Sequence, residues 1–166
     1  MTNKQATNGF TIVELIIVII IIAILTAVTA VTYSRVTAKS NDSAVAADAT
    51  NAARALEMAK VDLGRYPENN AEMPKFKFSK KAYDLKQNNV YYCVDKANQT
   101  YALGLRSKSG KGYIQTSTGL IEGVGISGAA TCTTIGKTWV NDATTAVMQG
   151  YSGSTGLWST GWSWTS

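Results

Sequence analysis

The chain has no histidine and only two cysteines among its 166 residues. Histidine is the commonest general base and the commonest metal ligand, so its absence removes the usual routes to acid–base and metal chemistry. Cys93 and Cys132 are too few for a four-cysteine zinc site, and no histidine completes a mixed one. The chain also has no glycine-rich phosphate loop of the required form. We therefore expect no enzyme activity, no metal and no cofactor.

Charge is absent from residues 15–31, LIIVIIIIAILTAVTAV. Together with Phe10 to Val13, the apolar stretch covers 22 positions and is interrupted only by Glu14. As a helix it would be about 33 Å long, which is enough to cross a bilayer. We expect a membrane-spanning helix over residues 10–31. An ordinary secretory signal is the alternative, since Ala27 and Ala30 supply small residues late in the run.

Glu14 is a carboxylate within this apolar segment. Such a charge costs about 2.5–3.5 kcal/mol on insertion scales, so it is expected to have a partner. If the chain were cut after Gly9, Phe10 would carry a new α-amino group one helical turn before Glu14. The two charges could pair within one helix, or between neighbouring subunits, where they would fix an axial offset.

Residues 9–15, GFTIVEL, resemble the cleavage and methylation motif of type IV prepilins and related pseudopilins. The resemblance implies that a prepilin peptidase removes a leader of residues 1–9 by cutting between Gly9 and Phe10. It also implies N-methylation of Phe10 and a role for Glu14 in recruiting or registering incoming subunits. Many pilins have Pro or Gly within the apolar segment, but this run has neither, so partial melting of the helix in a filament stays open.

The sequence changes character at residues 32–63, where we expect the helix to continue as an amphipathic one. The pattern predicts a buried stripe of mostly small side chains at steps of three and four: Val45, Ala49, Ala52, Leu56, Ala59 and Leu63. Gly64 should end the helix, and the polar residues 40–43 are its weakest point, where a bend is plausible.

Residues 64–166 are expected to form a β-rich head. After a loop-rich connection over residues 68–89, strand-like runs follow at 90–94, 100–106, 112–116 and 120–121, separated by turn-rich segments. An antiparallel meander of this kind needs cover on its apolar face, which the helical stripe can supply. The predicted fold class is α+β: a long N-terminal helix, apolar in its first half and amphipathic in its second, packed on a small antiparallel sheet, as in type IV pilins.

Cys93 lies in the first predicted strand, and Cys132 follows the last one. In an exported chain the two cysteines indicate one disulfide, and a disulfide that ties the carboxy-terminal region to the sheet is also what the resemblance implies. Two buried free thiols are the alternative. The tryptophan-rich residues 150–166 fit either a segment that closes the core or an exposed aromatic tail for adhesion or subunit contact.

The net charge is +5, but it is concentrated in residues 75–111, which hold nine Lys or Arg against two Asp. This basic region is a candidate site for an anion such as DNA, with four lysines as the test positions: Lys75, Lys77, Lys80 and Lys81. A solvated lysine-rich surface is the simpler interpretation.

The resemblance favours a structural subunit of a type IV pilus, which polymerises with copies of itself for adhesion, twitching motility or DNA uptake. It implies a pilus assembly ATPase and platform machinery as further partners. Such a subunit is a single-pass membrane protein before assembly and part of an extracellular pilus afterwards. The alternatives are a pseudopilin or minor pilin of a type II secretion or competence system, or a tip-located minor pilin that binds DNA or a host surface. Residues 132–166 contain only one acidic residue, Asp142, which disfavours a pseudopilin with an acidic calcium loop.

Overall fold

One long helix, α1, runs from Ile12 to Leu63 in the computed structural model, which describes residues 9–165 and the side chains up to residue 163. The long N-terminal helix predicted from the sequence is therefore confirmed. Gly64 follows it with a φ of 74°, a left-handed conformation that favours glycine and ends a helix. Residues 40–43, the predicted weak point, are helical.

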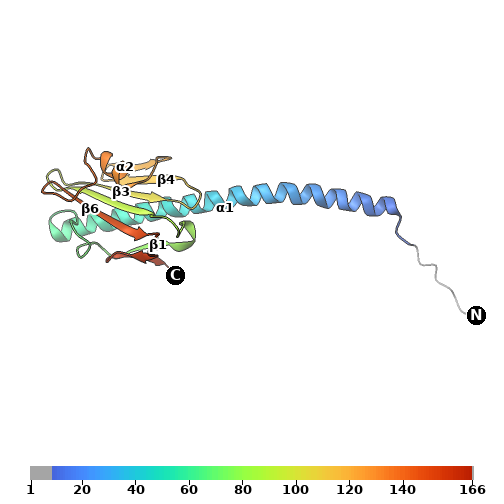
Figure 1. Ribbon diagram of the computed structural model, residues 1–166, viewed down its shortest axis with the longest axis horizontal. Helices are drawn as coiled ribbons and strands as arrows, with labels where there is room; N and C mark the ends of the chain where they lie inside the picture. Colours follow the sequence, from blue (N-terminus) through green and yellow to red (C-terminus); the bar gives the residue numbers. More distant parts are fainter. Residues whose placement is uncertain (1–8, 166) are drawn as a thin grey trace, which may run out of the picture. The chain divides into compact units, whose positions relative to one another are not determined.

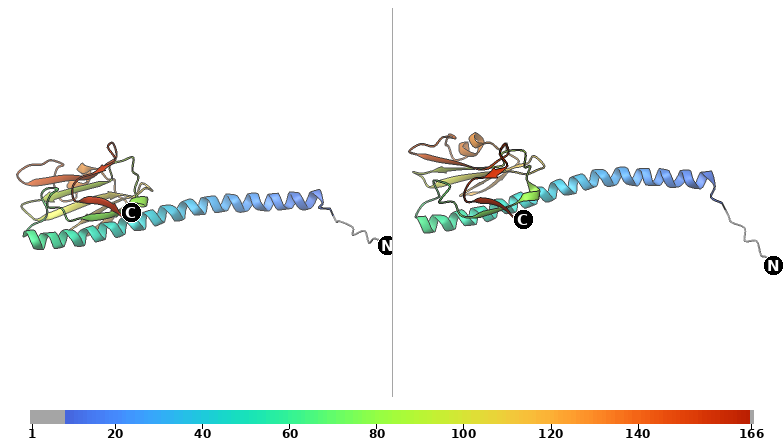
Figure 2. Two further views of the ribbon diagram at one scale, coloured as in Figure 1. Left: turned by 90° about the horizontal axis from the view of Figure 1, so that it is seen from below. Right: turned by 60° about the horizontal axis from the view of Figure 1, so that its bottom comes forward.

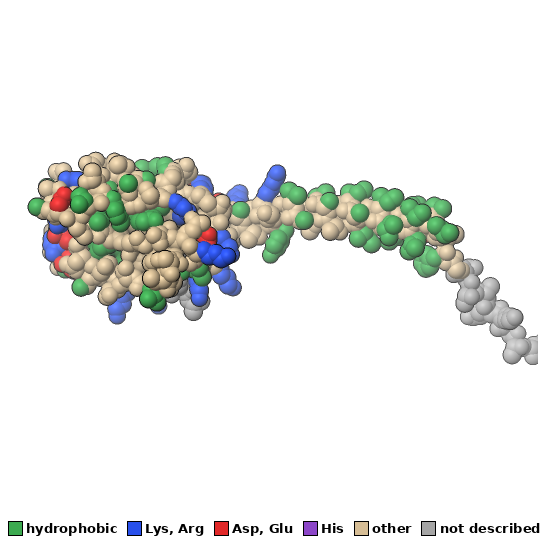
Figure 3. Space-filling view, viewed as in Figure 1, with side chains coloured by type: hydrophobic (Ala, Val, Ile, Leu, Met, Phe, Trp, Pro, Cys, Tyr) green, Lys and Arg blue, Asp and Glu red, His purple; other side chains and the backbone are tan. Residues whose placement is uncertain are grey.

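The chain divides into two units, one ending at Thr37 and one beginning at Ala38. The first unit contains the N-terminal part of α1, and its side chains are exposed from Gly9 to Thr37. Hydrophobic side chains predominate on this part of the helix, whereas the charged side chains gather on the second unit (Figure 3). The second unit contains the rest of α1 and all the strands (Figure 1).

The second unit is built on a six-stranded antiparallel sheet with the order β5-β4-β3-β2-β6-β7. Its strands are β2 (Val90–Asp95), β3 (Thr100–Arg106), β4 (Gly112–Thr116), β5 (Gly119–Glu122), β6 (Thr145–Ser152) and β7 (Leu157–Trp158). The predicted meander corresponds to β2 through β5. Strand β6 was not predicted, and it pairs with β2 after a short helix, α2 (Gly128–Thr133). Cys132 therefore lies on α2, before the last strands, and not after them.

A second, two-stranded sheet pairs β1 (Phe76–Ser79) with β8 (Trp162–Thr165) in parallel. Residues 68–89, predicted as a loop-rich connection, thus also contain the short strand β1 and the 3-10 helix η1 (Lys80–Ala82). The β1 strand is too short to stand out in a lysine-rich sequence. It is stabilised by a partner some 86 residues away, with Phe76 in register with Trp162.

The core lies between the C-terminal part of α1 and the sheets. Five of the six stripe residues are buried. Four of these five, all but Ala59, belong to one core cluster with side chains of the sheet that include Tyr92, Val94, Leu103 and Leu105. The sixth, Leu63, is 42% exposed, so the stripe ends one turn earlier than predicted. Tyr66, beyond the Gly64 turn, is buried instead and contacts the ring of Tyr101.

The carboxy-terminal tryptophans close this core. Trp162 is buried, with its ring centroid 4.8 Å from that of Phe76, and Trp158 stacks on Phe78 at 5.5 Å. Strand β8 lies beside β1 in all three ribbon views (Figure 2). Of the two interpretations of residues 150–166, core closure therefore holds for Trp158 and Trp162, whereas the side chain of Trp164 lies outside the described part.

Candidate functional site

The start of α1 is defined by reciprocal hydrogen bonds between Thr11 and Glu14. The Thr11 backbone amide and hydroxyl donate to Oε2 of Glu14 at 2.9 and 2.7 Å, and the Glu14 amide donates to the Thr11 hydroxyl at 3.2 Å. This is a capping box, with Thr11 at the N-cap and Glu14 at the third helical position. The carboxylate in the apolar segment thus has partners within its own chain.

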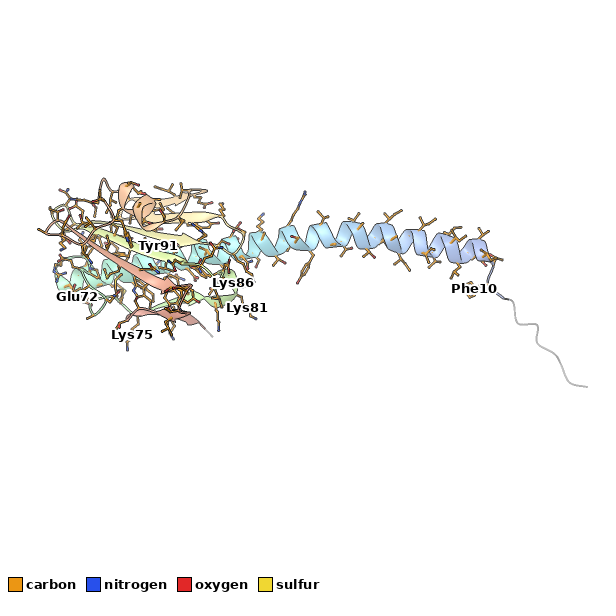
Figure 4. The ribbon with its side chains drawn as sticks, viewed as in Figure 1. Phe10, Glu72, Lys75, Lys81, Lys86 and Tyr91 are labelled. Carbon is orange, nitrogen blue, oxygen red and sulfur yellow. A yellow bond between two sulfur atoms is a disulfide. The ribbon has the colours of Figure 1, made fainter. Side chains whose placement is uncertain are left out.

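The capping box places the Gly9–Phe10 peptide bond outside the helix. Residues 9–11 are not helical, and Phe10 is 90% exposed. A side chain added at Gly9 would meet no atom within 4 Å, so nothing in the described structure requires glycine there. Figure 4 labels Phe10 at the N-terminal end of α1. The Gly9–Phe10 bond is therefore exposed and lies outside the helix.

The apolar segment carries large exposed side chains on all its faces, and α1 is long and apolar enough to cross a membrane. Its threonines do not break the helix. The hydroxyls of Thr26, Thr29 and Thr32 donate to the carbonyls of Ile22, Leu25 and Val28 at 2.7, 2.7 and 3.0 Å. Each hydroxyl is thereby paired without solvent, as a lipid environment requires.

The N-terminal region also matches a known family model, that of the prokaryotic N-terminal methylation motif, over residues 4–30. The chain carries the type IV prepilin class III signal peptide motif. The resemblance seen in residues 9–15 is thus confirmed. This prepilin motif supports a protein of the type IV pilin or pseudopilin type, a structural class not known as enzymatic. A search of the curated proteins and a search of the solved structures each found no match to the chain.

The two cysteines of the second unit form a disulfide, with 5.3 Å between the Cα atoms of Cys93 and Cys132. Both are fully buried. The bond ties α2 to the central strand β2, so it fixes the segment that leads from β5 to β6.

The four lysines singled out in the sequence are all exposed, but the structure separates them into two pairs. Lys75 and Lys77 flank or lie on β1 and line a groove with residues of α1. Lys80 and Lys81, on η1, line a different hollow together with Lys86 and Lys108. Of these lysines, Figure 4 labels Lys75, Lys81 and Lys86, and Lys75 lies apart from the other two. The basic region is therefore not one continuous patch.

Two features were missed by sequence reasoning: the capping box at the start of α1 and the grouping of Lys108 with Lys80 and Lys81. The capping box is readable locally, since the order Thr-x-x-Glu before an apolar run is its signature. The grouping of Lys108 with Lys80 and Lys81 is not readable, because it depends on a contact between η1 and the loop after β3, where the Lys108 amide donates to the Ala82 carbonyl at 2.7 Å.

Proposed function

We propose that this chain is a pilin, a structural subunit that polymerises through its N-terminal helix into a type IV pilus. The observation that carries the proposal is the prepilin motif at residues 4–30, joined to a helix whose apolar side chains are exposed. Such a surface is unstable in water and needs either lipid or neighbouring helices around it. The subunit acts by polymerising with copies of itself rather than by catalysis.

In this proposal the chain has four segments. Residues 1–9 are a leader, residues 10–31 the membrane and filament-core helix, residues 32–63 the amphipathic helix, and residues 64–166 the head. A prepilin peptidase cuts between Gly9 and Phe10, and Phe10 is then N-methylated. The exposed, non-helical Gly9–Phe10 bond supports this step. An assembly ATPase and a membrane platform then move the subunit from the membrane into an extracellular fibre.

Glu14 has the assembly role in this proposal. Its hydrogen bonds from Thr11 end on one carboxylate oxygen, Oε2. The carboxylate can therefore keep its own helix capped and still attract the α-amino group of a neighbouring subunit. A Glu14→Val subunit should be cleaved normally and yet be absent from fibres.

Mass spectrometry of sheared cell-surface material tests the proposal. A chain that begins at methylated Phe10, has Cys93 and Cys132 oxidised, and is abundant in fibres is the expected result. An uncut chain that keeps residues 1–9 despite an active peptidase would overturn the proposal and leave a simple membrane-anchored domain.

A pseudopilin or minor pilin of a secretion or competence system is the second candidate, because it shares the same prepilin motif. A pseudopilin with an acidic calcium loop is disfavoured, because Asp142 is the only acidic residue in the sequence from 132 to 166. The Oδ1 atom of Asp142 already accepts hydrogen bonds from the amides of Thr144 and Thr145 in its own turn, both at 2.7 Å. The same processed chain found only in membranes, in cells that make no fibres of it, would favour this candidate.

DNA binding by a tip-located minor pilin rests on the exposure of Lys75, Lys77, Lys80 and Lys81. It predicts a salt-sensitive affinity for duplex DNA that disappears when these lysines become Gln. The absence of binding at low salt would rule it out. Attachment to a host surface is the other role of such a tip subunit, and a fibre preparation that adheres equally with and without the protein would exclude it.

A further inference from the structure

Four lysines surround one hollow on the head, which we call the lysine hollow: Lys80, Lys81, Lys86 and Lys108. The hollow has a volume of about 790 Å³, and its lining is completed by Tyr83, Asp84 and Leu85. All four lysines are exposed, although they come from η1, the following loop and the turn after β3. The fold therefore gathers cations that are up to 28 positions apart in the sequence.

The positive charge of the lysine hollow is not neutralised within the described chain. Between residues 9 and 163, no carboxylate oxygen lies within ion-pair distance of any of the four ammonium groups. The one acidic side chain in the lining, Asp84, accepts hydrogen bonds from the Lys86 amide at 3.0 Å and from the Gln87 side chain at 2.9 Å. It is thus held by its own turn. A ligand for this hollow should be an anion.

Hydrogen bonds connect the residues around the lysine hollow to α1, near the point where α1 enters the second unit. The residue before η1, Ser79, and the lining residue Tyr83 both donate to Asp48 of α1, at 2.8 and 3.1 Å. On the Lys108 side, the next residue, Ser109, donates its hydroxyl hydrogen bond to Asp42. Both walls of the hollow are therefore tied to the first turns of α1 within the second unit.

The apolar segment and the head are joined by a short piece of chain. Ten residues lie between Val31, the end of the uncharged run, and Asp42. Even fully extended, this piece of chain spans at most about 40 Å. The hydrogen bonds to Asp48 and Asp42 hold the lysine hollow at the end of the head that this piece of chain enters. In a subunit anchored by its apolar segment, the lysine hollow is therefore within reach of the membrane surface.

We propose that the lysine hollow binds the phosphate of an anionic phospholipid headgroup while the subunit waits in the membrane. Lysines are phosphate ligands, and each one near an anionic membrane surface strengthens attachment about five-fold. The exposed Leu85 in the lining suits a site at an interface between water and lipid. The contact would hold the head at the bilayer until assembly withdraws the helix, and it would be lost in the fibre.

The proposal rests on the proposed membrane anchoring, so the test separates the two. The full chain is purified in a mild detergent, and phosphatidylglycerol or phosphatidylcholine is titrated while native mass spectrometry counts the bound lipid. The test variant is Lys81→Gln with Lys86→Gln. The control variant, Lys75→Gln with Lys77→Gln, removes the same charge from the other groove. None of these four ammonium groups forms a hydrogen bond within the described chain, so both variants should fold.

We expect the wild type and the control to bind phosphatidylglycerol at least ten-fold more tightly than phosphatidylcholine, and the test variant to lose most of that preference. Glycerol phosphate at the same concentration should not compete if the lipid is the source of the phosphate. Equal binding of the two lipids by the wild type, or an equal loss in the control, would overturn the proposal. So would a short DNA duplex that binds through Lys81 and Lys86 when the lipid does not.

Membrane anchoring is read separately, by flotation of the full chain with phosphatidylcholine vesicles at high salt. A chain that floats but shows no preference for phosphatidylglycerol would refute the lipid site alone. A chain that does not float would refute the anchoring on which the proposed function depends.

Discussion

The carboxylate of Asp48 in α1 accepts hydrogen bonds from both the backbone amide and the hydroxyl of Ser79, at 2.8 and 3.1 Å. Tyr83 donates a third, at 3.1 Å. Asp48 is the one charged member of the buried face of α1, between Val45 and Ala49. It joins the helix to the last residue of β1 and to the residue after η1, a connection that a hydrophobic side chain could not make.

Asp48 should make the stability of the head depend on pH. Burial raises the pKa of this carboxyl above 3.8, and the hydrogen bonds from Ser79 and Tyr83 oppose that rise only in part. The folded state holds the proton of Asp48 more tightly than the unfolded state does. The carboxyl therefore contributes fully to the free energy of unfolding below about pH 3.8, and this contribution decreases as pH rises through the elevated pKa. In Asp48→Asn, this decrease in stability with rising pH should disappear. Urea midpoints of the full chain in detergent, followed by tryptophan fluorescence from pH 3 to 7, measure it; parallel curves for the two proteins would contradict it.

Arg65 and Glu72 form a two-pronged ion pair after the helix, at 2.8 and 2.9 Å. The Arg65 guanidinium lowers the pKa of Glu72 to about 2. The contribution of this ion pair to the free energy of unfolding is present above about pH 4.5, the ordinary pKa of a glutamate carboxyl. It is lost as pH falls towards 2. Because Arg65 is more than a third exposed, solvent limits the effect, and we expect Glu72→Gln to cost about 1 kcal/mol at pH 7.

The same unfolding measurement checks this pair, with Glu68→Gln as the matched control. Glu68 lies 3.5 Å from the same guanidinium but makes only one contact with it, so its replacement should cost less. Equal losses at pH 7 for the two variants would show that the paired geometry adds nothing.

The disulfide should contribute a large share of the head's stability. The bond joins residues 39 positions apart, and loop-closure entropy for that separation gives about 4 kcal/mol. Replacing Cys93 and Cys132 by Ser should lower the free energy of unfolding by about that amount, with some further loss from two buried hydroxyls. Adding a reductant should destabilise the wild type and leave the variant unchanged. A reductant effect of equal size on both would point to another target.

Gly9 should matter for processing and not for folding. A side chain there meets no atom within 4 Å, so Gly9→Val should leave the unfolding free energy of the head unchanged to within about 0.5 kcal/mol. If a peptidase must approach the backbone closely, the same change should abolish cleavage. Co-expression with a prepilin peptidase and a gel shift of the product measure this. Normal cleavage of Gly9→Val would mean that the peptidase does not require glycine at this position.

Short-range patterns accounted for the elements that depend on neighbours in the chain. The strand-like runs at 90–94, 100–106, 112–116 and 120–121, separated by turn-rich segments, predicted a meander whose turns are local. Strand β6 was not predicted, and it is positioned by its pairing with β2, a strand some 55 residues earlier in the chain. Strand β1 was not predicted because it is only four residues long and Lys75 and Lys77 alternate with the buried Phe76 and Phe78.

By itself, the sequence determined that a long helix follows the Gly9–Phe10 bond, that its first half is apolar on every side, and that the chain carries the prepilin motif. These follow from contacts between residues at most four apart, such as the bonds from Thr11 to Glu14. The tertiary structure alone decided that Asp48 is buried, that β8 pairs with β1, and that Lys108 joins Lys80 and Lys81. The physical reason is that these arrangements depend on which distant segments pack together, and an isolated stretch of sequence does not specify its partner.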